Sequence, residues 1–386
     1  MDSEFPVYLD YAATTPCDPR VAAAMQACLT IDGVFGNPAS GHAYGRVARA
    51  RVEQARAQVA ALIHAPAPQL VWTSGSTEAN NLAILGTARA LRSRGRHLIT
   101  VRTEHKSVLD PCRHLQQEGF EVTYLAPDRD GLIATEQVRE ALRPDTLLVS
   151  VMHANNEIGV LQPIETIGDL CRAKGVALHV DASQSAGKVR IDVAQLRCDL
   201  LSLTAHKLYG PKGIGALYFA AERRASLQPL TFGGGHERGL RSGTLPVHQI
   251  VGFGAACELA AASLADDAAH SQRLRDLLWA GLRRIPDVLL NGHPTQRIGN
   301  ILNVSFPGVE GESLLMGLTE LAISTGSACN SDSDEPSYVL RALGRDTELA
   351  QSSLRFSVGR FSSEADVAVA VAAVSREVQR LRAAAA

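Results

Sequence analysis

One lysine in this chain stands where a nucleophilic amine can be produced. Lys207 lies at the end of a short apolar run that begins at Leu200, and a turn rich in glycine and proline, residues 210–215, follows it. This pattern predicts a buried strand with the lysine at its tip. Burial there lowers the pKa of an amine and so populates its neutral, nucleophilic form. Taken singly, such a lysine is more often a surface residue that follows a strand.

A carboxylate ends the apolar run that precedes this one. The segment Val176–Asp181 predicts a strand with Asp181 at its end, and by itself this residue could simply cap a helix. Together, Asp181 and Lys207 have a more specific interpretation. An amine that can form a Schiff base and an acid that keeps a pyridine nitrogen protonated are the two groups that pyridoxal phosphate (PLP) requires of a protein. The pair therefore indicates a PLP site.

Small polar residues in Thr73–Asn80 follow an expected strand and open an expected helix. Backbone N–H groups and hydroxyls at the positive end of a helix can close around a phosphate, which makes Ser76 and Thr77 candidate phosphate ligands. The same Ser/Thr-x-x-Glu pattern is also an ordinary helix cap. Thr204 and His206, next to the lysine, are further candidate phosphate donors.

Four more polar residues are candidates for cofactor and substrate contacts. His105 is expected at a strand end, where an imidazole can stack on the pyridine ring and relay protons, although a single histidine is usually structural. Asn156 and Gln184 could hold the phenolic oxygen of the cofactor or the carboxylate of a substrate. Arg355 alternates with apolar residues on a late strand. A buried arginine needs an anion, and a carboxylate held in bidentate fashion is the expected one.

The elements that must position these residues alternate between helix and strand from about residue 45 to 220. Strands separated by single helices predict a mostly parallel sheet covered on both faces, with ligands bound beyond the carboxyl ends of the strands. The expected strands are 70–73, 97–100, 120–125, 146–151 and 176–181, and the expected helices are 77–94, 106–118 and 163–174.

After about residue 262 the regular alternation of helix and strand ends, and strands and helices follow one another without a repeating unit. This favours a smaller α+β domain. Its expected elements are a long helix at 263–285, strands near 288–290, 299–305 and 353–358, and helices at 311–320 and 363–382.

Composition excludes several classes of protein. The 386 residues carry a net charge of −2 and no basic run of five, which argues against nucleic acid or a membrane surface as a partner. No apolar stretch approaches the ~20 residues of a spanning helix, and the acidic start predicts no signal peptide, so we expect a cytoplasmic protein. Seven cysteines, no two within five positions, exclude Cys-x-x-Cys metal pairs and suit reduced thiols.

The chain closely resembles the IscS/NifS-type cysteine desulfurases, PLP enzymes of fold type I in the class V aminotransferase family. The resemblance extends from Tyr8 to about Arg382. It implies the PLP-dependent transferase fold, α/β, with a large domain at 16–262 that holds a mostly parallel seven-stranded sheet. Residues 1–15 and 263–386 would form the smaller α+β domain. The motifs that carry the resemblance are Tyr8–Thr15, Phe35–Ser40, Glu104–Lys106, Asn155–Gly159, His179–Gln184 and Gly233–Gln249.

The resemblance also assigns roles. It implies that Lys207 forms the internal aldimine, that Asp181 pairs with the pyridine nitrogen, and that Gln184 and Asn156 contact the ring oxygen and the substrate. It further implies that Thr244 reaches the phosphate of the neighbouring subunit, which would make the active unit a homodimer.

Cys329 lies in a segment, about 324–337, that is rich in Gly, Ser and Asp and reads as a mobile loop. In the family this position carries the persulfide, and here Cys329 could transiently ligate an iron–sulfur cluster together with a scaffold partner; no other metal site is expected. Asp332, Asp334 and Glu335 make the segment more acidic than in housekeeping members, which could raise the pKa of the thiol. We also expect the C-terminal extension of housekeeping members to be missing.

The expected activity is conversion of L-cysteine to L-alanine, with the sulfur kept as a Cys329 persulfide. Acceptors would be sulfur-receiving proteins, such as an iron–sulfur scaffold or a tRNA-thiolation protein. The alternatives are a selenocysteine lyase or an aminotransferase on the same fold, or a desulfurase specialised for DNA phosphorothioation or nitrogenase maturation. A non-enzymatic platform for sulfur acceptors is disfavoured, because such a platform has no use for a Schiff-base lysine.

Overall fold

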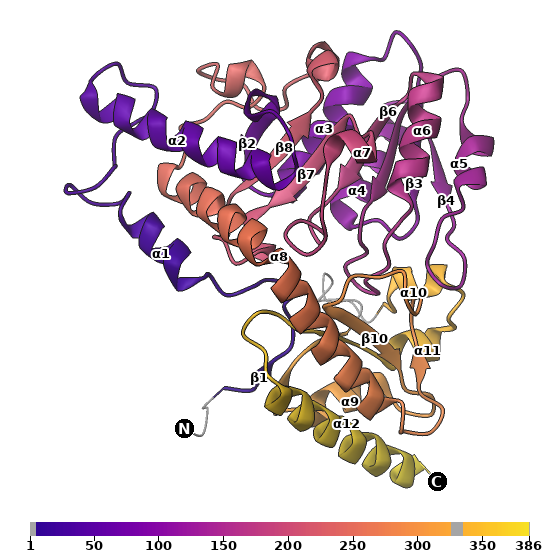
Figure 1. Cartoon of the computed structure of the whole chain (residues 1–386). Coiled ribbons are helices and arrows are strands. Elements are labelled where there is room, and N and C mark those ends of the chain that lie inside the picture. Colours follow the sequence, from indigo (N-terminus) through magenta and orange to yellow (C-terminus); the bar gives the residue numbers. More distant parts are fainter. Residues whose placement is uncertain (1–4, 326–334, 386) are drawn as a thin grey trace.

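Seven strands form the main sheet of the computed structural model, which describes residues 5–325 and 335–385 (Figure 1). Only β8 runs antiparallel to its neighbours, so the predicted mostly parallel seven-stranded sheet is confirmed. Nearly all positions of the central strands are buried, as expected for apolar runs covered on both faces. In spatial order the strands are β2 (Leu70–Thr73), β8 (Gly215–Phe219), β7 (Leu200–Thr204), β6 (Ala177–Asp181), β5 (Thr146–Met152), β3 (His97–Val101) and β4 (Glu121–Leu125).

Helices cover both faces of this sheet and bury two separate apolar clusters. On one face α3 (Ser76–Ala90) and α4 (Lys106–Gln117) pack on residues such as Val71. On the other face α2, α5, α6 and α7 pack on residues such as Trp72. Successive residues of a strand point to opposite faces of the sheet, so Val71 and Trp72, although adjacent in β2, are buried in different apolar clusters. The bounds of the second set are α2 (Ala43–Leu62), α5 (Thr135–Ala141), α6 (Ile164–Lys174) and α7 (Val193–Leu196).

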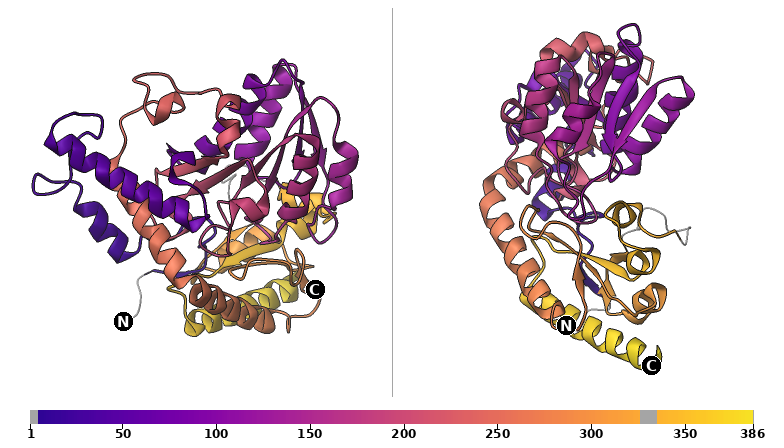
Figure 2. Two further views of the ribbon diagram at one scale, coloured as in Figure 1. Left: turned by 45° about the horizontal axis from the view of Figure 1, so that its top comes forward. Right: turned by 90° about the vertical axis from the view of Figure 1, so that its right-hand side faces the viewer.

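The smaller domain is built on a four-stranded antiparallel sheet in the order β12-β13-β10-β9 (Figure 2). The chain's N-terminal strand joins this domain, because β1 (Val7–Tyr8) pairs with β11 (Leu321–Ala322). Its other elements are β9 (Leu289–Leu290), β10 (Ile301–Ser305), α9 (Gly311–Gly317), β12 (Ser324–Thr325), α10 (Tyr338–Ala342), α11 (Thr347–Gln351), β13 (Ser353–Ser357) and α12 (Glu364–Ala385).

One helix, α8 (Val247–Leu282), runs along both domains (Figure 2). The sequence prediction of a helix from 263 was therefore wrong in its start, and the expected boundary at 262 falls inside α8. Residues up to Ala260 are buried in the large-domain core, whereas those from Leu274 on are buried in the small-domain core. The change of pattern near 262 marks a change of core within one helix.

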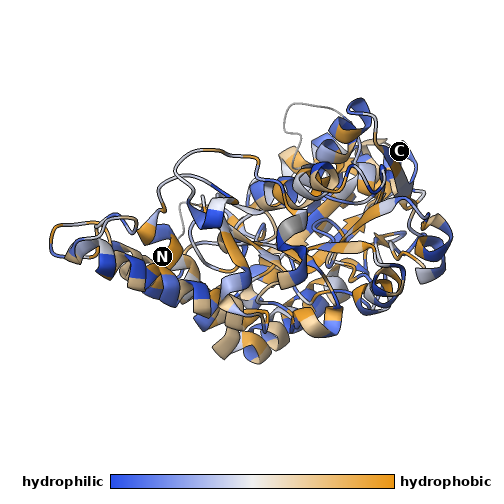
Figure 3. Ribbon diagram, turned by 90° about the horizontal axis from the view of Figure 1, so that it is seen from above, coloured by the Kyte–Doolittle hydropathy of each residue, from blue (hydrophilic) through white to orange (hydrophobic). Residues whose placement is uncertain are grey.

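Among the described helices, α8 is long and apolar enough, by length and composition, to cross a membrane. The sequence analysis had found no such stretch. The helix is partly buried in two protein cores, which is the arrangement of a core helix. Figure 3 shows apolar residues along the interior strands and mixed character on the helices that cover them.

The remaining differences from the sequence prediction are local. The strand β8 was missed because its first residue, Gly215, was taken as part of the turn after Lys207. A Cβ at Gly215 would lie 2.5 Å from the carbonyl oxygen of Leu203, so this glycine allows the strand to pass close to its neighbour. The helix expected at 311–320 ends at Gly317. Short elements that were not expected are the helices α1 (Pro19–Gln26), α5, α7, α10 and α11, the strands β11 and β12, and the 3₁₀ turns η1 (Ala67–Gln69), η2 (Ala205–Lys207), η3 (Ala221–Ser226) and η4 (Glu237–Gly239).

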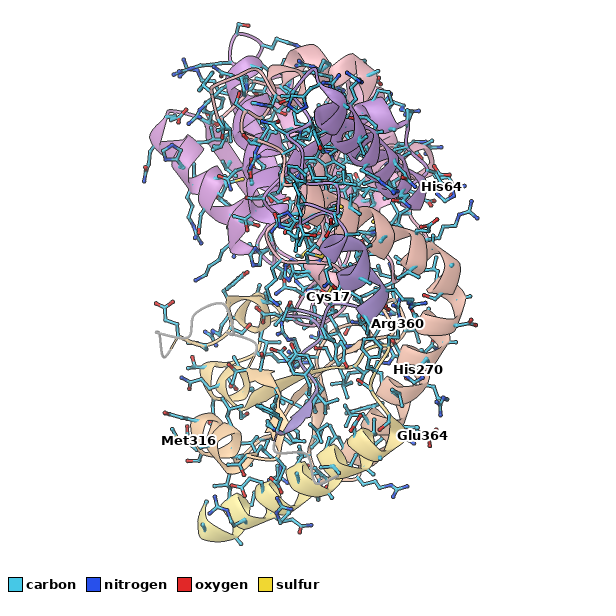
Figure 4. The ribbon with its side chains drawn as sticks, turned by 90° about the vertical axis from the view of Figure 1, so that its left-hand side faces the viewer. Cys17, His64, His270, Met316, Arg360 and Glu364 are labelled. Atoms are coloured by element: carbon cyan, nitrogen blue, oxygen red, sulfur yellow. The ribbon has the colours of Figure 1, made fainter. Side chains whose placement is uncertain are left out.

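The two domains are also joined by ion pairs at the N-terminal segment. Arg360 pairs with Asp267 on α8 and with Asp18 next to α1, at 2.7 and 2.8 Å. Its guanidinium carbon lies 4.3 Å from the ring centroid of Tyr209, which is two residues from Lys207. Figure 4 shows Arg360 at the junction, close to the segment that carries Cys17. This network fixes the lysine turn against the small domain.

Candidate active site

The predicted residues lie where the carboxyl ends of the large-sheet strands meet the small domain. Asp181 ends β6, Lys207 lies in the turn η2 directly after β7, and His105 caps α4 at its N-terminus after β3. Asn156 follows β5, and Ser76 begins α3 after β2. Parallel strands bring their ends to one edge, so local sequence patterns become one site.

A row of hydrogen bonds connects Asp181 with His105. The side-chain nitrogen of Asn80 donates both to Oδ2 of Asp181 and to Oγ of Ser107, each at 2.8 Å. Oγ of Ser107 lies 2.8 Å from Nδ1 of His105. Three elements, α3, α4 and β6, are held together by this row.

Asp181 is buried and remains ionised. Burial, the largest effect, raises the pKa of its carboxyl, but hydrogen bonds from Ser183 and Asn80 and the charge of Lys207 outweigh burial and lower the pKa. Both the backbone N–H and the hydroxyl of Ser183 donate to Oδ1. A buried carboxylate held in this way is suited to keep a bound pyridine nitrogen protonated.

His105 is held in one tautomer. Its Nδ1 accepts the backbone N–H of Ser107 over 3.1 Å, so the proton of the neutral ring lies on Nε2. Burial, and next the charge of Lys207, lower the pKa of His105 below its ordinary value. The ring is therefore neutral at pH 7, with an N–H to donate.

Lys207 is half-buried in a strongly basic surrounding. The amine of the half-buried Lys188 donates to the backbone carbonyl of Lys207 over 3.1 Å. Burial and the charge of Lys207 lower the pKa of Lys188 to about 7. Burial and neighbouring lysines, Lys207 first, lower the pKa of His206 to about 4. Lys207 therefore lies beside two basic side chains that release their protons more readily than usual.

The N-terminus of α3 suits a phosphate. Its N-cap is Gly75, which offers no side chain to the first N–H groups of the helix, at Ser76 and Thr77. Oγ1 of Thr204 lies 4.0 Å from the position that a Cβ on Gly75 would take. Nδ1 of His206 lies 3.2 Å from Oγ1 of Thr14. Thr204 therefore lies beside the open helix end, as the phosphate prediction requires.

Two buried amides keep an unpaired oxygen. Within the described part of the chain, Oδ1 of Asn156 and Oε1 of Gln184 have no hydrogen-bond partner. Nε2 of Gln184 donates to the carbonyl of Ala12 over 2.8 Å. Buried polar atoms are rarely left unsatisfied, so a polar ligand at this place would supply what the protein lacks.

Arg355 already has an anion in the structure. On β13, its Nη2 donates to Oδ1 of Asp10 over 2.7 Å, and its Nη1 donates to the carbonyl of Asn156 over 3.0 Å. The sequence had suggested a substrate carboxylate as the anion and had not singled out Asp10. Nε of Arg355 has no partner among the described residues, which leaves one donor for a ligand. Substrate binding by Arg355 stays a prediction.

The roles expected for Thr244 and Cys329 are not tested by the described residues. Thr244 is exposed in the segment before α8. Cys329 lies outside the described residues, as do Asp332 and Asp334, whereas Glu335 is described and exposed. The homodimer and the persulfide role remain predictions.

The sequence analysis missed three residues that shape the site: Asn80, Ser107 and Ser183. Asn80 ends the motif Thr73–Asn80 and lies one helical turn after Ser76, a spacing that could have indicated a shared face. Ser107 and Ser183 each lie two residues after a predicted residue, a common spacing for side-chain contacts to the backbone at strand ends.

Comparison with known proteins decides the family. The model of the aminotransferase class-V family matches residues 7–369. A curated cysteine desulfurase, IscS from Shewanella baltica (strain OS223), is 56% identical over 380 residues, which cover 98% of this chain and 94% of that protein. The chain belongs to the cysteine desulfurases of the class-V aminotransferase family.

Solved structures of related cysteine desulfurases and NifS-like proteins share this fold. A NifS-like protein superimposes with a TM-score of 0.91 at 34% identity and covers 98% of this chain and 100% of its own. SspA, solved in complex with cysteine, has a TM-score of 0.83 at 38% identity. The match covers 92% of this chain and 99% of SspA. Class-V aminotransferases and cysteine desulfurases are PLP enzymes, and the charged Asp181, the open helix end and the unpaired amides fit that cofactor.

Proposed function

We propose that this member of the cysteine desulfurases converts L-cysteine to L-alanine and keeps the sulfur as a persulfide on Cys329. The Cβ–S bond of cysteine breaks, and its electron pair remains on Cβ. An S–S bond forms to Sγ of Cys329, so the two thiols are oxidised while Cβ is reduced. Of the two thiol protons, one remains on the persulfide and one, in net terms, ends on Cβ.

The residues that would hold the cofactor come from four strand ends. Lys207 would attach it covalently, Asp181 would face its ring nitrogen, and His105 would stack on its ring. Its phosphate would lie at the N-terminus of α3, and PLP supplies an electron sink that stabilises negative charge at Cα. The phosphate contacts would be Ser76, Thr77, Thr204, His206 and, from a second subunit, Thr244.

The protein's own groups would move the protons. The amine of Lys207 would take the Cα proton of cysteine, and His105 would give the proton on Nε2 to the reacting groups and take it back afterwards, because both residues lie near the buried Asp181. Asn156 and Nε of Arg355 would orient the carboxylate of the substrate. The row Asp181–Asn80–Ser107–His105 carries this proposal, since it fixes the acid and the imidazole relative to each other.

The active unit would be a homodimer. Large apolar side chains are exposed near the segment of Thr244 and on the arm formed by α1 and α2, which a second copy could cover. The exposed apolar residues are Leu29, Ile31, Phe35, Tyr44, Val47 and Phe232.

The cysteines at 28, 112, 171, 198 and 257 are free and buried, which supports a reducing, cytoplasmic setting.

The test combines cofactor and product. Purified protein should carry PLP in a form that borohydride reduction fixes on Lys207, found by peptide mass spectrometry. It should also release alanine from L-cysteine with one persulfide per chain. In Lys207→Ala both signals should vanish, whereas Lys212→Ala, a nearby exposed lysine, should keep both. PLP fixed on another lysine, or no alanine from the wild type, would refute the proposal.

A further inference from the structure

Residues 326–334, which contain Cys329, are called the Cys329 segment from here on. The chain that follows this segment is fixed to the large domain. Ser337 lies three residues after that segment and is the N-cap of α10, where its Oγ accepts the N–H of Leu340 over 3.2 Å. The same hydroxyl donates to Oε2 of Glu157 over 2.5 Å. Both Ser337 and Glu157 are buried. Because Glu157 follows Asn156 directly, this bond ends next to an expected substrate contact.

A second contact reaches the segment that carries His105. The hydroxyl of Tyr338 donates to the backbone carbonyl of Glu104 over 2.7 Å. Glu104 is buried and directly precedes His105. Val339 and Leu340 on α10 then pack in one apolar cluster with Ile158 and Val160 of the large domain.

The residues before the Cys329 segment reach the same place from the other side. Ser324 on β12 pairs with Arg355 on β13, and its hydroxyl donates to Oδ2 of Asp10 over 2.9 Å. Asp10 is also the anion of Arg355. Both described ends of the Cys329 segment therefore meet residues that border the substrate position.

From this geometry we propose that Ser337 and Tyr338 are positioning residues for the attack of the Cys329 thiol on the substrate sulfur. The inference rests on the proposed function. Ser337 and Tyr338 fix the chain eight and nine residues after Cys329 against the walls that carry Asn156 and His105. Fixed ends restrict the space that a tethered group explores and raise its effective concentration at the target.

The position of the Cys329 thiol, rather than the length of the chain that carries it, should determine how much persulfide formation slows. Release of Ser337 would lengthen the chain between the fixed residues on either side by only a few residues, and the entropy of a loop grows only with the logarithm of its length. A shift of the thiol by about 1 Å, in contrast, can slow a reaction by up to ~100-fold. Loss of the anchor should therefore slow persulfide formation without changing the steps that need only Lys207, His105 and substrate.

The experiment separates these steps in the holoenzyme. Ser337→Ala and Tyr338→Phe are each mixed with one equivalent of L-cysteine. The rate of the absorbance change of the bound cofactor reports the early steps. The rate of persulfide formation on Cys329, measured by quenching with an alkylating agent and mass spectrometry, reports the attack. We expect an unchanged absorbance change and persulfide formation slowed about tenfold in each variant, the factor that corresponds to ~1.4 kcal/mol of barrier.

Control variants distinguish positioning from folding. Tyr124→Phe removes a hydroxyl that bonds Gln116 in the pocket that Tyr338 also lines, and it should behave as wild type because the bond from Tyr338 to Glu104 remains. Ser337→Thr retains the hydroxyl and the N-cap, and it should restore most of the rate. Tyr338→Phe changes one atom and should fold, so the proposal stays testable if Ser337→Ala does not.

The outcomes separate the two proposals. If the wild type forms no persulfide on Cys329, the proposed function fails. If the wild type forms it and both anchor variants match its rate, or lose the absorbance change in the same proportion as persulfide formation, the positioning role is wrong.

Discussion

Asp181 and Asn80 are joined by a hydrogen bond of 2.8 Å between two buried side chains that are 101 positions apart in the chain. The same amide nitrogen of Asn80 also reaches Ser107, the partner of His105. One amide thus sets both the charge of the acid and the orientation of the imidazole. This relationship makes Asn80 a component of the site, although it is not expected to touch substrate.

Replacement of Asn80 should weaken the acid. Asn80→Ala removes a donor that lowers the pKa of Asp181, so this pKa should rise and activity should fall about tenfold, as expected when a hydrogen bond to a charged group is lost. The measurement is the pH dependence of cofactor absorbance together with kcat. Asn81→Ala, which removes an amide that donates to the carbonyl of Thr77, is the control. Equal profiles for the two variants would contradict the role of Asn80.

Removal of the loop thiol should separate the chemistry into two parts. Because the thiol acts only after proton removal at Cα, Cys329→Ser should still change the cofactor absorbance with L-cysteine yet release almost no alanine. The measurement is single-turnover absorbance with amino-acid analysis, and Cys17→Ser, an exposed free cysteine, is the control. Alanine at the wild-type rate would show that Cys329 does not carry the sulfur.

Glu157 should make stability depend on pH. Burial, partly opposed by the hydrogen bond from Ser337 and the charge of Arg355, raises the pKa of this carboxyl to about 7. Between its unfolded value of 4.5 and about 7 the folded state binds the extra proton, so stability falls as pH rises through this window. Glu157→Gln keeps an acceptor for Ser337 and removes the titration.

The variant Glu157→Gln should therefore be more stable than wild type at pH 8, by up to about 3 kcal/mol, and no more stable at pH 4. Denaturant unfolding at a series of pH values measures this difference. Glu165→Gln, an exposed residue at the start of α6, should show no such trend. A constant difference across pH would mean that Glu157 titrates alike in both states.

Loss of Arg360 should loosen the junction of the domains. Arg360→Ala removes the ion pairs to Asp267 and Asp18 and the contact with Tyr209, and leaves the buried Asp18 with Arg20 alone. We expect a loss of about 3 kcal/mol, typical of breaking a largely buried pair. Arg273→Ala removes the exposed ion pair to Glu364 and should cost less than ~1 kcal/mol. Glu364 is labelled in Figure 4. Thermal unfolding of the two variants checks the contrast, and equal losses would contradict it.

The sequence by itself determined the elements and the chemical types at their ends. Apolar runs such as those before Asp181 and Lys207 are local patterns, and a parallel sheet gathers strand ends at one edge, so the two key residues could be predicted. The family motifs added Thr244 and Cys329, which no periodicity indicates. The expected phosphate position at Ser76 also came from local pattern, because an open helix end needs only neighbours in sequence, and it stays a prediction.

Only the tertiary structure decided which partners these residues have. Asn80 bonds Asp181, Asp10 is the anion of Arg355, and Ser337 bonds Glu157, and each pair is separated by 101 to 345 positions. Such pairs depend on the order of strands in the sheet and on how the small domain meets it. Likewise, α8 continues through the expected boundary because its two halves lie in different cores. Periodicity reports which face of an element is buried, but the group that satisfies a buried charge is fixed by what packs against it.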